Sequence, residues 1–265
     1  MDHLSQQDLN ILLVEPSPTQ RRIIVQELLC ENVTAVDQAN SIATALSSIQ
    51  SVHPDLVASA LYLEDGTAMD LFRMLRTSED CRDTPFMLVS SERRHEQLDQ
   101  FKQAGVVAIL PKPFTRDHLR RALRATVDLL SPEELNSDAF DIENLRVLSV
   151  DDSLMARKMV RKVVTNLGIT DVTEAKDGAE AQQLLSDKEF DLIITDYNMP
   201  NMDGAELASF VRSTPEYSHI PIMMVTSEQD EAKLGYVSQC GVDAIIDKPF
   251  SPEEVRRLLQ KVMEG

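Results

Sequence analysis

The sequence predicts an α/β protein with two doubly wound parallel sheets in tandem, one in each half of the chain. The first observation is a gapless internal repeat, in which one constant offset brings Asp55-Leu56 onto Asp191-Leu192 and Lys112-Pro113-Phe114 onto Lys248-Pro249-Phe250. The second is that short apolar runs alternate with helically spaced apolar residues in each copy. The third is that the central apolar runs are continuous, as in parallel strands covered on both faces. Each copy is therefore expected to be a five-stranded (βα)5 unit.

The elements of the second copy follow in order. The run Leu145–Val150 predicts the first strand, and the helical spacing of residues 153–167, ended by Gly168, predicts the first helix. The same signals predict strands over 171–174, 190–195, 221–226 and 244–246, and helices over 179–186, 205–212, 231–240 and from Ser251 onward. That last helix opens with Ser as N-cap, Pro at the first helical position and two acids. The first copy repeats this plan from a strand at 9–14 to a helix at 116–130.

The repeat sets the domain bounds. A chain of 265 residues suggests about two domains, and we predict them at residues 8–130 and 145–265. Residues 131–144 would form the linker, which is polar and acidic. Its composition is compatible with a short extra helix and equally with a solvated tether.

Charge and cysteine content exclude several classes of protein. The net charge is -18 and both halves are acidic, so nucleic-acid binding is not expected and a protein or a cation is the favoured partner. The three cysteines are scattered without zinc-site spacing, as in a reducing compartment. The N-terminus lacks a signal-peptide pattern, and no apolar run is long enough to span a membrane. We therefore expect a cytoplasmic protein that does not insert into membranes.

Five polar residues are expected to converge at one edge of the second sheet. Asp151 and Asp152 follow its first strand, Asp196 ends the third, Thr226 ends the fourth and Lys248 follows the fifth. Open parallel sheets bind ligands at the carboxyl ends of their strands. Clustered carboxylates repel one another unless a cation lies between them, and Mg²⁺ favours such oxygen ligands. A carboxylate beside that ion can attack phosphorus and form an acyl phosphate, while a lysine and a hydroxyl stabilise the phosphoryl oxygens.

These motifs resemble the receiver domain of two-component response regulators. The resemblance is carried by Asp151-Asp152, Asp196–Gly204, Thr226-Ser227-Glu228 and Lys248-Pro249-Phe250, and it covers residues 145–265. The stretch Asp196–Gly204 is most similar to that of single-domain chemotaxis response regulators. The resemblance implies a flavodoxin-like fold, with Asp196 as the phosphoacceptor.

The resemblance also implies a role for the residues around the phosphoacceptor. Asp152, Asp196 and the backbone carbonyl of Asn198 would ligate Mg²⁺, and Asp151 would act through water. The switch residues would be Thr226 and Lys248.

Three further positions would tune the site. By the same resemblance, Asn198 and Glu228 occupy the positions that tune dephosphorylation. The family often has Tyr or Phe where this chain has Ile245, so a switch that moves an aromatic ring is not expected in its usual form.

The first copy retains the fold signals without the chemistry, and we interpret it as a pseudo-receiver. Ala60 stands where the second copy has its phosphoacceptor, and Pro16 stands where it has a metal ligand. Three counterparts remain, namely Glu15, Ser90 and Lys112. Glu64 and Asp65 lie too far beyond the strand end to replace the lost acid. A fold kept without the chemistry suggests a packing role, namely docking, dimerisation, partner recognition or contact with the other domain.

Three functions are compatible with these residues. The leading one is a response regulator that a sensor histidine kinase phosphorylates on Asp196, with output through an unknown downstream protein, as in motility control. An alternative is a phosphate sink that drains a kinase shared with another regulator. A remote alternative is an aspartyl-phosphate-forming phosphohydrolase, but Asn198 stands where its acid would be needed. We therefore do not expect an enzyme.

Overall fold

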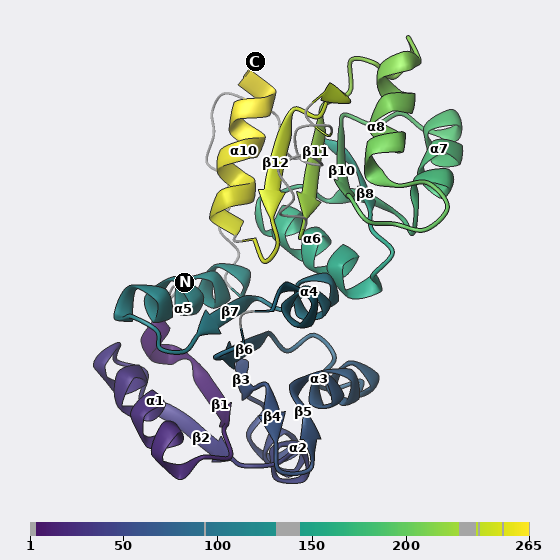
Figure 1. The fold of residues 1–265 in the computed structure, drawn as a ribbon. Coiled ribbons are helices and arrows are strands. Elements are labelled where there is room, and N and C mark those ends of the chain that lie inside the picture. Colours follow the sequence, from purple (N-terminus) through teal and green to yellow (C-terminus); the bar gives the residue numbers. More distant parts are fainter. Residues whose placement is uncertain are drawn as a thin grey trace. The chain divides into compact units, whose positions relative to one another are not determined.

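The computed structural model describes residues 4–92, 94–130, 144–227, 237, 239–250 and 252–264. It divides into two compact units, and each holds one copy of the repeat apart from residues 102–105, which are grouped with the second unit (Figure 1). Each unit is a five-stranded parallel sheet with flanking helices, which confirms the predicted fold class. The predicted linker falls outside the described residues except for Asn144.

The first unit has the strand order β2-β1-β3-β6-β7. The strands are β1 (Asn10–Val14), β2 (Ala35–Ala39), β3 (Leu56–Ala60), β6 (Phe86–Ser90) and β7 (Ala108–Pro111). The helices are α1 (Pro18–Cys30), α2 (Ile42–Val52), α3 (Ala68–Thr77), α4 (His95–Ala104) and α5 (Arg116–Leu130), preceded by a short 3-10 turn at Gln6–Asp8. Every residue of β3 and β6 is buried, as the continuous apolar runs predict for central strands.

The second unit has the equivalent order β9-β8-β10-β11-β12. The strands are β8 (Arg146–Val150), β9 (Asp171–Ala175), β10 (Leu192–Asp196), β11 (Ile222–Thr226) and β12 (Ala244–Asp247). The described helices are α6 (Leu154–Asn166), α7 (Gly178–Asp187), α8 (Gly204–Ser213) and α10 (Pro252–Glu264). The helix expected over 231–240 lies largely outside the described residues. The third strand begins at Leu192, two residues later than expected. Phe190 extends the apolar run before the strand because it packs into the core from the preceding loop.

The core of the second unit lies between the sheet and its two helical layers. Helices α6 and α10 pack against each other, and α7 packs against α8. The core cluster combines residues of β8, β10, α7 and α8, among them Leu148, Ile193, Leu185, Leu207 and Val211. Among the described helices, none is both long enough and apolar enough to cross a membrane.

Side-chain caps begin the helices directly at the carboxyl edge of the second sheet. Ser153 accepts a hydrogen bond from the Ala156 amide at the start of α6, and Asp203 accepts one from Glu206 at the start of α8. Such caps satisfy amides that the helix itself leaves unpaired. The loops that lead from strand to helix are therefore short and fixed, and they hold whatever side chains they carry at this edge.

The loop after β3 forms a small hairpin in the first unit. Its strands are β4 (Tyr62–Leu63) and β5 (Gly66–Thr67), which pair antiparallel. The Asp65 carboxylate at its tip accepts hydrogen bonds from the Ile42 and Ala43 amides of α2, at 2.6 and 3.0 Å. This carboxylate therefore caps a helix.

Candidate functional site

The structure brings the predicted polar residues together at the carboxyl edge of the second sheet. Asp151 follows β8, Asp196 ends β10, Thr226 ends β11 and Lys248 follows β12. These four are buried, with exposed fractions of 3%, 1%, 0% and 4%. Asp152, next to Asp151, is exposed to solvent. Because burying charge is unfavourable without a partner, these groups must compensate one another or bind a ligand.

Lys248 lies between the two buried carboxylates. Its Nζ atom is 2.7 Å from Oδ2 of Asp151 and 3.1 Å from Oδ1 of Asp196. Asp151 is further held by the Ser153 amide, which donates to Oδ1 at 2.8 Å. By contrast, the Asp196 carboxylate is held only loosely, by the Lys248 ammonium and the Tyr197 amide, and among the described residues neither oxygen has a partner at strict hydrogen-bond geometry. Buried polar atoms are nearly always satisfied, so the Asp196 carboxylate is free to take part in ligand binding or chemistry.

Burial and crowding perturb the protonation of these groups. Burial raises the pKa of Asp196 to about 7; the Lys248 ammonium opposes this rise and the Asp151 carboxylate adds to it. Burial likewise raises the pKa of Asp151, against the opposing effect of Lys248. The pKa of Lys248 is raised, because its two carboxylate partners outweigh the effect of burial. One lysine thus serves two acids, and the site has a deficit of positive charge.

The same acids form a candidate cation site. Asp151, Asp152 and Asp196 each offer a carboxylate oxygen, and these oxygens lie within 4.8 Å of one another. All three donors are hard oxygens, which suits Mg²⁺ rather than a thiolate- or imidazole-seeking metal. The unsatisfied oxygens of Asp196 are a second reason for this assignment. The residues present therefore fit a magnesium ion.

The positions expected to tune the site have different environments. The side chain of Asn198 is exposed beyond the end of β10. Ile245 on β12 is half-buried and packs against a small cluster that contains Ala205 and Met224. Glu228 lies outside the described residues. Ile245 therefore places an aliphatic side chain at the position where the family often has an aromatic ring.

Sequence reasoning missed the role of Gly204 at the start of α8. A Cβ atom on this residue would lie 2.1 Å from the backbone oxygen of Asp196, far inside van der Waals contact. Glycine is thus required for helix α8 to approach the end of β10 this closely. The signal was available in the repeat, because the aligned residue of the first copy is Ala68.

The first unit replaces the open acidic site with a closed ion pair. Its lysine, Lys112, lies 2.5 Å from Oε2 of Glu15, whose other oxygen accepts a hydrogen bond from the Ser17 amide at 2.9 Å. Glu15 is buried, and the buried residue Ala60 supplies no further carboxylate. Glu15 thus has the same two kinds of partner as Asp151, a lysine and the amide two residues on, but its lysine has no second carboxylate to neutralise.

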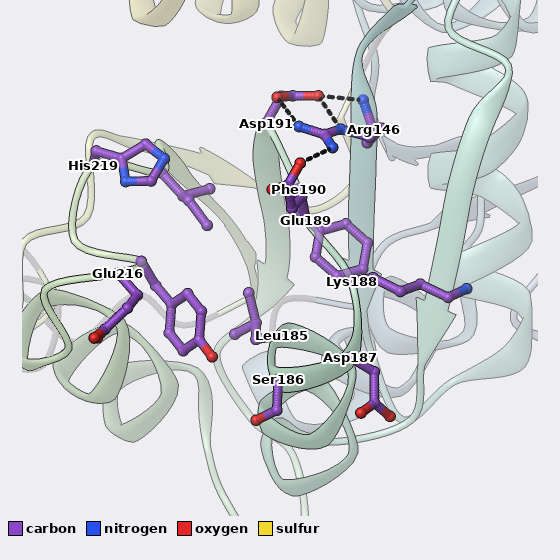
Figure 2. A pocket seen from close by; sticks show the side chains of 12 residues that line it. Arg146, Leu185, Ser186, Asp187, Lys188, Glu189, Phe190, Asp191, Glu216 and His219 are labelled. Carbon is purple, nitrogen blue, oxygen red and sulfur yellow. Dashed lines mark hydrogen bonds and ion pairs between the residues drawn. The ribbon is translucent and has the colours of Figure 1, made fainter.

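A pocket of about 480 Å³ lies at the opposite edge of the second sheet (Figure 2). There Arg146, at the start of β8, donates to Asp191 through Nε and Nη2 and to Glu189 through Nη1. The aligned residues Asn10 and Asp55 keep the backbone part of this contact in the first unit. This pocket contains none of the predicted site residues.

Comparison with known proteins identifies both units. The response regulator receiver domain family matches residues 11–124 and 147–260. Chemotaxis protein CheY-3 of Vibrio cholerae is 34% identical over 122 residues, which cover 46% of this chain and 94% of that protein. A CheY homolog of Campylobacter jejuni is 40% identical over 120 residues, 45% of this chain and 92% of that protein. The solved structure of CheY4 of Vibrio cholerae aligns with 44% of this chain and 98% of its own, at 38% identity and a TM-score of 0.42.

Proposed function

Since the chain belongs to the response regulator receiver domain family, we propose that it is a two-component response regulator with a single phosphorylatable domain. In this proposal a histidine kinase phosphorylates Asp196, and the chain is a substrate of the kinase rather than an enzyme. The observation that carries the proposal is the buried and loosely held carboxylate of Asp196, which lies 3.1 Å from Lys248. The first unit has Ala60 at this position and is proposed to be a pseudo-receiver.

The chemical step follows from the groups at the site. A carboxylate oxygen of Asp196 attacks the phosphorus of a phosphohistidine, the phosphorus–nitrogen bond breaks, and the imidazole nitrogen takes the electron pair. Lys248 and Thr226 are placed to pair with and to hydrogen-bond the oxygens of the incoming phosphoryl group. The new group adds about -1.5 to -2 charges at neutral pH, which draws both residues toward it.

Magnesium would be held by Asp152, Asp196 and the backbone carbonyl of Asn198, with Asp151 acting through water, by family likeness. When bound, the cation offsets the negative charge of the carboxylates and of the phosphoryl oxygens. The contribution of the chain is to keep three carboxylates converged and Lys248 in place before the donor arrives.

The output is proposed to be a change in protein binding. The relatives named above are chemotaxis proteins, which favours motility control as the pathway. The first unit would contribute a surface that does not depend on phosphate, because its lysine is already neutralised by Glu15. It would serve for docking, for contact with the second unit or for association of two chains.

Intact-mass analysis tests this proposal. We expect acetyl phosphate with Mg²⁺ to add one phosphoryl group to the chain and none to Asp196→Ala. Glu15→Gln is the matched control, because it changes the equivalent acid of the first unit and should still accept one group. Addition of two groups, or modification of Asp196→Ala, would show that the proposed acceptor is wrong.

A further inference from the structure

Arg157 on α6 binds the backbone of the acidic pair. Its Nη1 atom donates to the carbonyl oxygens of Asp151 and Asp152, at 2.6 and 3.4 Å. The side chain is only 14% exposed. One guanidinium group thus hydrogen-bonds both carbonyl oxygens. Its orientation therefore determines the orientation of the backbone that carries the two carboxylates.

Glu174 on β9 in turn orients this arginine. Its Oε2 atom lies 3.2 Å from Nε of Arg157, and its Oε1 atom lies 2.6 Å from Nε of Arg161. Arg161 is itself fixed, because it also donates to the Val172 carbonyl at 2.8 Å. Glu174 is therefore held between two arginines, and it fixes the plane of the Arg157 guanidinium. Charge-assisted hydrogen bonds of this kind are among the stronger and more directional contacts in proteins.

The repeat supplies an internal comparison. The first unit keeps the arginine, since Arg21 donates to the Glu15 and Ala39 carbonyls at 3.1 and 3.4 Å. In the aligned positions, however, Gln38 replaces Glu174 and Val25 replaces Arg161. No carboxylate among the residues that the structure describes pairs with Arg21. The fold thus uses the arginine in both units, whereas the carboxylate that orients it accompanies the acidic site.

We propose that Glu174 is a positioning residue for divalent-cation binding: it orients Arg157, and through it the Asp151-Asp152 backbone, so that the carboxylates converge on one cation. This inference rests on the proposed function, because it takes the acidic cluster to be a Mg²⁺ site. It assigns a role to a residue that lies outside that cluster and contacts it only through Arg157.

A purely electrostatic role makes a different prediction from a positioning role. Glu174→Gln leaves two arginines beside the site and should weaken cation binding under either explanation. Arg161→Gln removes a positive charge, so electrostatics alone would strengthen cation binding. If Arg161 acts by holding Glu174, the same substitution weakens binding. The sign of the effect of Arg161→Gln therefore separates the two explanations.

Titration calorimetry of the full chain with MgCl2 gives the required affinities. We expect Glu174→Gln and Arg157→Lys to raise the Kd for Mg²⁺ about tenfold, as changes to groups behind metal ligands commonly do. Arg161→Gln should raise it by a smaller factor. Glu189→Gln is the matched control, because it removes the same charge at the opposite edge of the sheet and should leave the Kd unchanged.

A second measurement needs no metal. The Arg157 Nε–H group should give a distinct, slowly exchanging NMR signal in the wild type, and this signal should be lost in Glu174→Gln. An unchanged Kd in Glu174→Gln, or tighter binding in Arg161→Gln, would overturn the positioning role while the proposed function stands. A wild type without saturable Mg²⁺ binding would instead overturn the proposed function, and the positioning role with it.

Discussion

Replacing Glu15 with Gln should destabilise the first unit, because it breaks the buried ion pair between Glu15 and Lys112. The Glu15 side chain is 6% exposed and the Lys112 side chain 19%, and no other described carboxylate pairs with this lysine. Glutamine keeps an oxygen that can accept the hydrogen bond from the Ser17 amide. The substitution therefore removes the charge while largely preserving the shape.

The expected size follows from the burial of the pair. Removing one partner of a buried ion pair costs about 3–5 kcal/mol, because the other charge is left buried without compensation. Lys112 retains some contact with water, so we expect a cost below this range, about 2–3 kcal/mol. That corresponds to an increase of about 30- to 150-fold in the equilibrium constant for opening of the first unit.

Amide hydrogen exchange followed by mass spectrometry can measure this in the full chain. Peptides from β1 and β7 should exchange faster in Glu15→Gln, while peptides from β8 and β12 should not change. Asp151→Asn is the matched control in the second unit. It should change exchange less than Glu15→Gln does, because Lys248 keeps Asp196 as a charged partner. Combining Glu15→Gln with Lys112→Met should recover much of the loss, because no unpaired charge remains. Unchanged exchange in Glu15→Gln would refute the reasoning.

Three further outcomes are expected. Asp152→Ala should weaken Mg²⁺ binding more than Asp151→Ala does, as titration calorimetry can show, because the former is the proposed direct ligand. Gly204→Ala should lower the thermal midpoint and slow phosphorylation by acetyl phosphate, because its Cβ would overlap the backbone oxygen of Asp196, the proposed acceptor. Asp191→Asn should cost no more than about 1 kcal/mol at neutral pH in urea titrations, because water screens this partly exposed ion pair. Hydrogen bonds from Arg146 lower the pKa of Asp191 below 3.8, so its stabilisation is present above that pH and should disappear on acidification.

The sequence was sufficient to predict the site wherever a functional residue directly follows an apolar run. Asp196 and Thr226 end buried strands, and the structure places both at the expected edge. This inference works because parallel strands in a doubly wound sheet all end at the same edge. The position of a residue along the chain then determines its position in space.

Contacts that depend on distances between elements could not be predicted in this way. The requirement for Gly204 arises from the close approach of α8 to the end of β10, which no local pattern reports. The contact of Glu174 with Arg157 depends on which side chain of β9 faces α6. The capping of α2 by Asp65 joins two segments that look like separate loops in the sequence. Each of these needs the packed arrangement of elements to be known.

The closed ion pair of the first unit has an evolutionary consequence. A mutation of Ala60 to Asp would place a second carboxylate beside Glu15, with only Lys112 to neutralise both. The second unit shows the cost of such crowding, because burial and repulsion raise the pKa of Asp196 to about 7. Without an acid in place of Pro16, the mutation would not restore a full set of cation ligands. The Ala60 change is therefore unfavourable by itself, and selection would have to retain several changes together before the first unit offered the same acidic site as the second.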